Sequence, residues 1–150
     1  NRPKEDFTAW GINLSTVLQI CESDRAIFSF VTGEGIASYM NDGGVDLAPT
    51  SAVPPSPVAL VPLRGYVAYY DRYWSDRWSS AIGYSRLEFD NLGGQTPKAY
   101  KGGDYASVNL LHYPNDRVMY GIEFLWGQRE DRDGATGQDR RIQTSFKYSF

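Results

Sequence analysis

Residues 139–150 alternate without a break between two kinds of side chain, and this pattern constrains the fold more than any other feature of the chain. One set is apolar or aromatic apart from one threonine: Ile142, Thr144, Phe146, Tyr148 and Phe150. The other set is polar: Arg141, Gln143, Ser145, Lys147 and Ser149. Successive side chains of a strand point to opposite sides, so the pattern predicts a β-strand between two environments. A strand of a soluble sandwich fits this pattern, and so does a strand of a membrane β-barrel with lipid outside and water inside.

The rest of the chain repeats the pattern less regularly. Strand and turn rules predict strands at residues 7–20, 25–36, 62–73, 77–89, 104–113, 117–129 and 139–150. Alternation is clear in 7–20 and 117–129 and weakest in 62–73 and 77–89. We therefore predict an all-β fold, an antiparallel meander of about seven strands.

The connections between these segments alternate in length. Short turns at 21–24, 74–76 and 114–116 alternate with long polar loops at 37–61, 90–103 and 130–138. In an antiparallel meander all short turns then lie at one end and all long loops at the other, with Phe150 at the short-turn end. Outer-membrane barrels show the same asymmetry, with short periplasmic turns and long external loops.

The loop at 37–61 is rich in proline, with Pro49, Pro54, Pro55 and Pro57. Proline cannot donate to a central ladder, so we expect extended polyproline-like chain here. Two placements remain open: a solvated external loop, or a loop that folds into a barrel mouth and narrows it.

Composition restricts the class of protein. No apolar run approaches the roughly 18 residues that a membrane helix needs, and a net charge of −3 gives no reason to expect nucleic acid as a partner. One histidine and one cysteine, Cys21, supply neither a disulfide, a typical zinc site nor a catalytic triad. Asp131-x-Asp133-Gly134 matches part of a calcium loop without its later glutamate, so a solvated hairpin loop is expected. We expect no enzyme, no cofactor and no metal.

Several motifs, in this order and spacing, carry a family resemblance. They are WGINLS at 10–15, GEGIASYMND at 33–42, GYVAY at 65–69, GYSR at 83–86, YASVNL at 105–110, GIE at 121–123, GQRED at 127–131 and KYSF at 147–150. Together they resemble the C-terminal part of DcaP-like outer-membrane porins over nearly the whole chain.

The resemblance implies a Gram-negative outer-membrane channel for passive diffusion of small hydrophilic solutes, often anionic or dicarboxylic. It implies a homotrimer of barrels with roughly 16 strands each, an even number as bacterial barrels have. It implies contact with outer-membrane lipid, and with the barrel-assembly machinery through the terminal aromatic residue Phe150. Because about seven strands are predicted here, we expect residues 1–150 to be the C-terminal portion of one longer transmembrane barrel domain.

A porin needs a polar lumen whose charged groups bias which ions dwell there. Alternation places eight side chains in the lumen: Asn13, Gln19, Ser107, Asn109, Glu123, Arg141, Gln143 and Lys147. Arg64, Arg72 and Arg77 are expected to join them, the alternative for Arg72 and Arg77 being contact with water or headgroups beside a short turn. A lumen rich in arginine concentrates anions.

Aromatic residues near strand ends suit interfacial belts. The candidates are Trp10, Tyr69, Trp74, Trp78, Tyr84, Tyr113, Tyr120, Trp126 and Tyr148.

Two other functions stay open. A soluble lipocalin-like barrel would turn the apolar side chains inward, around a dry ligand cavity lined by Trp10, Phe28, Phe124 and Phe146. An outer-membrane adhesin or structural barrel would use the long loops instead. In any of these folds an open sheet leaves two edges that need cover.

Overall fold

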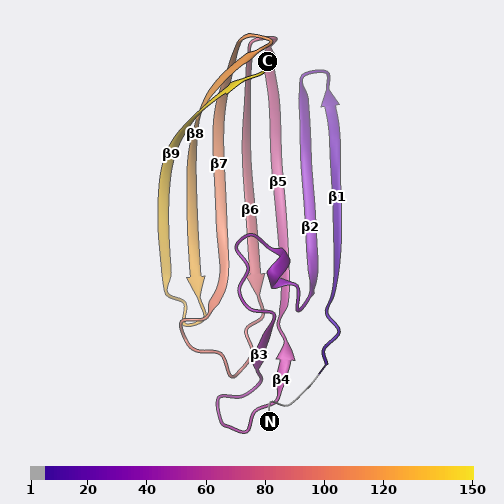
Figure 1. Ribbon diagram of the computed structural model, residues 1–150, viewed down its shortest axis with the longest axis vertical. Coiled ribbons are helices and arrows are strands. Elements are labelled where there is room, and N and C mark those ends of the chain that lie inside the picture. Colours follow the sequence, from indigo (N-terminus) through magenta and orange to yellow (C-terminus); the bar gives the residue numbers. More distant parts are fainter. Residues whose placement is uncertain (1–5) are drawn as a thin grey trace.

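The strands form one antiparallel sheet in chain order (Figure 1). A computed structural model describes residues 6–150, and residues 1–5 of the predicted domain lie outside this described part. The seven strands of the sheet are β1 (Trp10–Cys21), β2 (Asp24–Glu34), β5 (Pro62–Ser75), β6 (Trp78–Phe89), β7 (Tyr100–Asn115), β8 (Val118–Asp131) and β9 (Thr136–Tyr148). The predicted all-β meander is confirmed.

At the long-loop end β7, β8 and β9 extend further than the sequence pattern predicts, whereas β1 and β2 are two to three residues shorter there. β7 begins at Tyr100, which pairs with Asp131 of β8. Gly102 and Gly103 read as loop residues in the sequence, yet both pair with β6 and β8. Glycine has a low strand propensity, but here backbone hydrogen bonds to strands on both sides hold these two residues in extended conformation.

All short connections lie at one end of the sheet, as predicted. Figure 1 shows the turns β1–β2, β5–β6 and β7–β8 at the top with the C-terminus, and the long connections at the bottom. The backbone N–H of Ser149 donates to the carbonyl of Arg117 over 2.8 Å. Phe150 therefore lies just beyond the end of β9, with its side chain fully exposed.

Residues 35–61 connect β2 to β5 and are called the docked loop. This segment contains a short 3₁₀ helix, η1 (Ala37–Tyr39), and a ribbon of two short strands, β3 (Leu47–Pro49) and β4 (Val58–Leu60). The expectation of polyproline-like chain alone is therefore incomplete. Pro49 pairs at the end of β3, where a missing N–H costs little, and the other prolines lie in the tip between the two strands.

A hydrophobic cluster anchors the docked loop to the long-loop end of the sheet. Ile36, Ala37, Ala48 and Val61 of the loop are buried together with Leu63 of β5 and Phe89 of β6. Gly11 and Gly33 leave room for the Ile36 side chain, because a Cβ at these positions would lie 2.7 Å and 2.8 Å from its Cδ1.

No helix among residues 6–150 has the length and apolar character to cross a membrane.

Candidate functional site

The strand register divides the side chains of the sheet into two faces. Residues directly opposite each other on neighbouring strands share a face, and alternate residues along each strand do the same. The polar face carries Asn13, Ser29, Val67, Ser85, Ser107, Asn109, Glu123, Arg141, Gln143 and Lys147. The apolar face carries Leu14, Phe28, Tyr70, Ile82, Val108, Phe124, Ile142 and Phe146.

The apolar face is uncovered by any other part of residues 6–150. Leu14 is 66% exposed, Ile82 60%, and Ile142 and Phe146 69% each. Monomeric soluble proteins rarely expose a contiguous apolar surface of this extent. The face therefore requires an apolar environment or a partner.

A row of rings borders the apolar face at the short-turn end. Trp78 packs on His112 with ring centroids 4.1 Å apart, His112 on Tyr120 at 5.5 Å, and Tyr120 on Phe146 at 6.4 Å. Of the predicted belt residues, Trp78 and Tyr120 lie in this row, whereas Tyr69 lies on the polar face with its hydroxyl 3.3 Å from Ser107 Oγ. The only histidine of the sequence thus lies among rings, and its Nδ1 is 3.1 Å from the carbonyl oxygen of Arg77.

The docked loop lies over the polar face. Between them is an open groove of about 930 Å³, lined by residues 40–45 of the loop and by polar-face residues that reach from β2 to β9. Among the latter are Ser29, Val67, Ser85, Tyr105 and Asp139. The loop therefore packs on the sheet, and its narrowing of a barrel mouth stays a prediction.

Hydrogen bonds hold several polar-face side chains along the sheet surface. Asn109 Oδ1 accepts a bond of 2.9 Å from the backbone N–H of Ala81. Gln143 Nε2 donates to Glu123 Oε2 over 2.5 Å. The register places Asn109, Glu123 and Gln143 in one row across β7, β8 and β9, so three predicted lumen residues are neighbours.

The cations of the polar face differ in their partners. Arg25 Nε pairs with Asp71 Oδ2 at 2.7 Å. Arg141 and Lys147, both on β9, form no ion pair within residues 6–150. Positive charge is therefore available on this face near β9.

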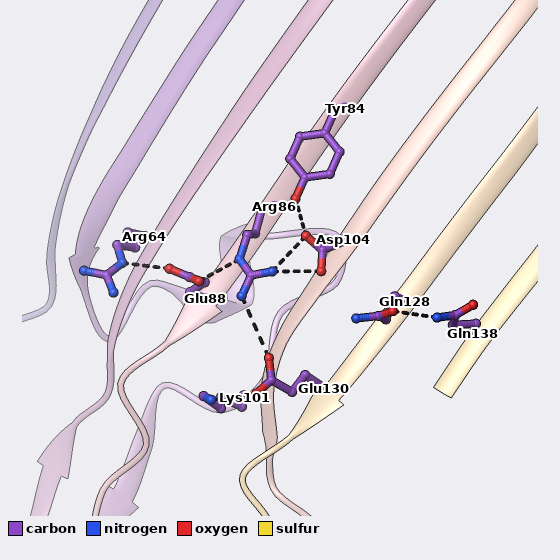
Figure 2. Close-up of polar contacts among 9 residues, drawn as sticks. All are labelled: Arg64, Tyr84, Arg86, Glu88, Lys101, Asp104, Gln128, Glu130 and Gln138. Atoms are coloured by element: carbon purple, nitrogen blue, oxygen red, sulfur yellow. Dashed lines mark hydrogen bonds and ion pairs between the residues drawn. The ribbon is translucent and has the colours of Figure 1, made fainter. Parts of the chain in front are cut away.

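The expectation that Arg64 and Arg72 share the face of Arg141 is wrong. Arg64 pairs with Glu88 across the strands, with Nε 2.9 Å from Oε2 (Figure 2), and both lie on the apolar face beyond its apolar band. Arg72 is 3.3 Å from Asp24 on the same face, and its guanidinium stacks 4.6 Å from the Trp74 ring centroid. Tyrosines occupy both faces of β5, so alternation along this strand does not distinguish them.

Other site residues fall outside what strand alternation could assign. Arg77 lies in the turn after β5, where its carbonyl accepts a bond from the backbone N–H of Tyr113. Asp42 reaches the groove from the docked loop, a segment without periodicity. Tyr105 and Ser85 differ from these two residues, because alternation around Ser107 and Gly83 does assign them to the polar face.

The connection between β8 and β9 is a hairpin loop with paired carboxylates. Asp131 Oδ1 is 2.7 Å from Arg129 Nε, and Asp133 Oδ2 is 2.9 Å from Lys98 Nζ. The hydrogen bond from Lys98 holds the pKa of Asp133 below its usual value. No cluster of three or more potential metal ligands occurs within the described part of the chain.

The fold is similar to that of a known channel. The crystal structure of the outer membrane channel DcaP of Acinetobacter baumannii superposes with a TM-score of 0.89 at 19% sequence identity. The match covers 97% of this chain and 42% of the DcaP chain, so the chain spans less than half the length of that protein. No protein-family model matches the sequence, and no curated protein matches it. At the level of the fold, the predicted resemblance is confirmed.

Proposed function

We propose that the sheet is part of the wall of an outer-membrane porin, with the apolar face toward lipid and the polar face toward a water-filled lumen. The observation that carries this proposal is the position of the docked loop, which packs on the polar face and leaves the apolar face uncovered. A barrel wall needs this arrangement, because its lipid side must stay apolar while loops fold into the aqueous interior.

The two edges of the sheet are an argument that it belongs to a larger barrel. β1 and β9 each pair on one side only within residues 6–150. Unpaired backbone groups at a sheet edge are not tolerated in the hydrocarbon region of a bilayer. We propose that further strands pair with both edges, and that these residues are the C-terminal portion of a barrel domain of roughly 16 strands, as the resemblance implies. Homotrimer formation and recognition of Phe150 by the assembly machinery belong to the same proposal.

The proposed solutes are small, hydrophilic and anionic, including dicarboxylates. Support comes from Arg141 and Lys147, the polar-face cations without an ion-pair partner within residues 6–150. A guanidinium group binds a carboxylate through two parallel hydrogen bonds. Arg64 and Arg72 take no part in this selectivity, because they lie on the other face.

The soluble ligand-binding alternative is less well supported. It requires the apolar face, which carries Trp10, Phe28, Phe124 and Phe146, to enclose a dry cavity. The docked loop covers the opposite face, and these four side chains are each more than two-fifths exposed. No specific observation favours an adhesin.

The test is single-channel conductance of the full-length protein in planar bilayers, with anion/cation selectivity from the reversal potential. Arg141→Ala is expected to lower anion preference. Arg64→Ala is the matched control, since it removes the same charge from the other face. Absence of stepwise conductance would refute the porin proposal, and an equal effect of the two variants would refute the assignment of the faces.

A further inference from the structure

The apolar face contains a hollow in its last apolar row toward the long-loop end. One row of residues across the strands alternates large and small side chains: Phe28, Ala68, Tyr84, Ala106 and Trp126. The two alanines leave depressions on either side of the Tyr84 ring. The resulting groove of about 550 Å³ is lined almost entirely by apolar atoms.

A network of charged side chains begins one row beyond this groove, toward the long-loop end (Figure 2). Arg86 is its centre, with Nη1 2.8 Å and 2.9 Å from the carboxylate oxygens of Asp104 and Nε 2.6 Å from Glu88. Glu130 lies 3.8 Å from Arg86 and accepts a bond of 2.6 Å from Lys101. Arg86, Glu88, Asp104 and Glu130 lie on the same face as Ile82 and Phe124. Lys101 is the unpaired residue of a bulge between Tyr100 and Gly102, and its ammonium group reaches this face at Glu130.

Tyr84 joins the groove to the network. Its ring lines the groove, and its hydroxyl donates to Asp104 (Figure 2). The apolar hollow and the charged cluster are therefore one continuous surface, with the hollow toward the short-turn end and the charged cluster toward the long-loop end. A lipid molecule likewise joins an apolar acyl chain to a polar headgroup.

The network has free hydrogen-bond donors, whereas its carboxylate acceptors already face cations. Every carboxylate oxygen of Glu88, Asp104 and Glu130 faces a cation of the network. Arg64 uses only Nε, toward Glu88, so its two Nη groups have no acceptor within residues 6–150. The side chains of Arg64 and Lys101 are 55% and 49% exposed. Free guanidinium and ammonium N–H groups are the usual partners of phosphate oxygens.

We propose that this surface is a specific site for an anionic, phosphate-bearing lipid. An acyl chain lies in the groove between Phe28 and Trp126, and the phosphate accepts hydrogen bonds from Arg64 and Lys101. The site rests on the proposed function, which turns this face toward lipid and places the long-loop end outside. In that orientation the network lies at the level of the outer headgroups and the groove lies below it.

Native mass spectrometry of the full-length protein, delipidated in detergent, tests the site. Phosphatidylglycerol and phosphatidylcholine with identical acyl chains are the probes, since they differ in net headgroup charge. The wild type is expected to retain phosphatidylglycerol about tenfold better, the scale of one charge-assisted hydrogen bond. Arg64→Gln with Lys101→Gln should abolish that preference, whereas the polar-face control Arg141→Gln should keep it.

Ala106→Leu tests the groove independently of the network. Filling the hollow should weaken retention of both lipids, and Ala68→Leu fills the other side if the first variant fails to fold. Equal retention of the two lipids by the wild type would overturn the proposal. So would variants that change the number of protein copies in the complex while lipid retention stays the same, because the face would then contact a second copy. Single-channel conductance is measured on the same samples. Conductance without a lipid preference would overturn the lipid site alone, whereas absence of conductance would refute the porin proposal.

Discussion

Replacement of Ile82 by arginine tests the orientation of the sheet in a membrane. Ile82 lies in the apolar band of β6, which runs from Trp78 to Tyr84 and ends where Arg86 begins. At about 3.3 Å per residue this band is roughly 20 Å long, and Ile82 lies about 7 Å from Tyr84 at one end of the band and about 13 Å from Trp78 at the other. Arginine on the lipid face of a barrel costs about 2–4 kcal/mol at the midplane and about 0–1 kcal/mol near the interface.

Because Ile82 is off the midplane, we expect Ile82→Arg to cost about 2 kcal/mol, roughly a thirty-fold decrease in the folding equilibrium constant. The matched control is Ala81→Arg, the adjacent residue on the polar face, where the new cation faces Asp71 and water. Its cost should stay within about 0.5 kcal/mol. The assay is denaturant titration of the full-length protein folded into phospholipid vesicles. Equal costs, or a larger cost for Ala81→Arg, would contradict the assigned faces.

Three further outcomes are expected. Val61→Ala removes two methyl groups from a fully buried site. It should lower the free energy that holds the docked loop on the sheet by about 2 kcal/mol, and amide hydrogen exchange in the loop should become faster. The folded pKa of Asp133 is lowered by Lys98, so their contact stabilises the loop above the unfolded pKa of about 4. This stabilisation is lost as pH falls through the folded pKa. Lys98→Met should remove this pH-dependent stabilisation, measured by amide hydrogen exchange in the loop, and an unchanged stability profile would refute the role of the contact. Gly83→Ala places a Cβ into the Tyr69 ring and should cost about 1–3 kcal/mol, less in a Tyr69→Ala background.

The fold was predictable from sequence where one side of a strand is uniformly apolar. In β8 and β9 the alternation is regular, and it assigns Glu123 and Arg141 to one face, as the strand register does. In β5 it failed for Arg64, because tyrosine suits both a wet and an apolar surface and occupies both faces of that strand.

The docked loop shows a second limit of local patterns. Its position depends on Ile36 and Val61 meeting Phe89, a contact between segments that are distant in sequence. The charged network is a third case, since Arg86 and Asp104 meet only through the register of β6 and β7. Periodicity reports which side a residue faces and gives no information about which partner it meets there.

Each strand of the sheet pairs only with its neighbours in chain order. This has a consequence for engineering the protein and for its evolutionary divergence. Every ladder of the sheet joins consecutive strands of the meander. Adding or removing one hairpin, such as β7–β8, therefore leaves the other ladders unchanged. It would alter the circumference of a closed wall by about 9–10 Å, two interstrand spacings. Barrel diameter grows with strand number, so a wall of this design can change its bore by whole hairpins while each retained hairpin keeps its own inner and outer surfaces.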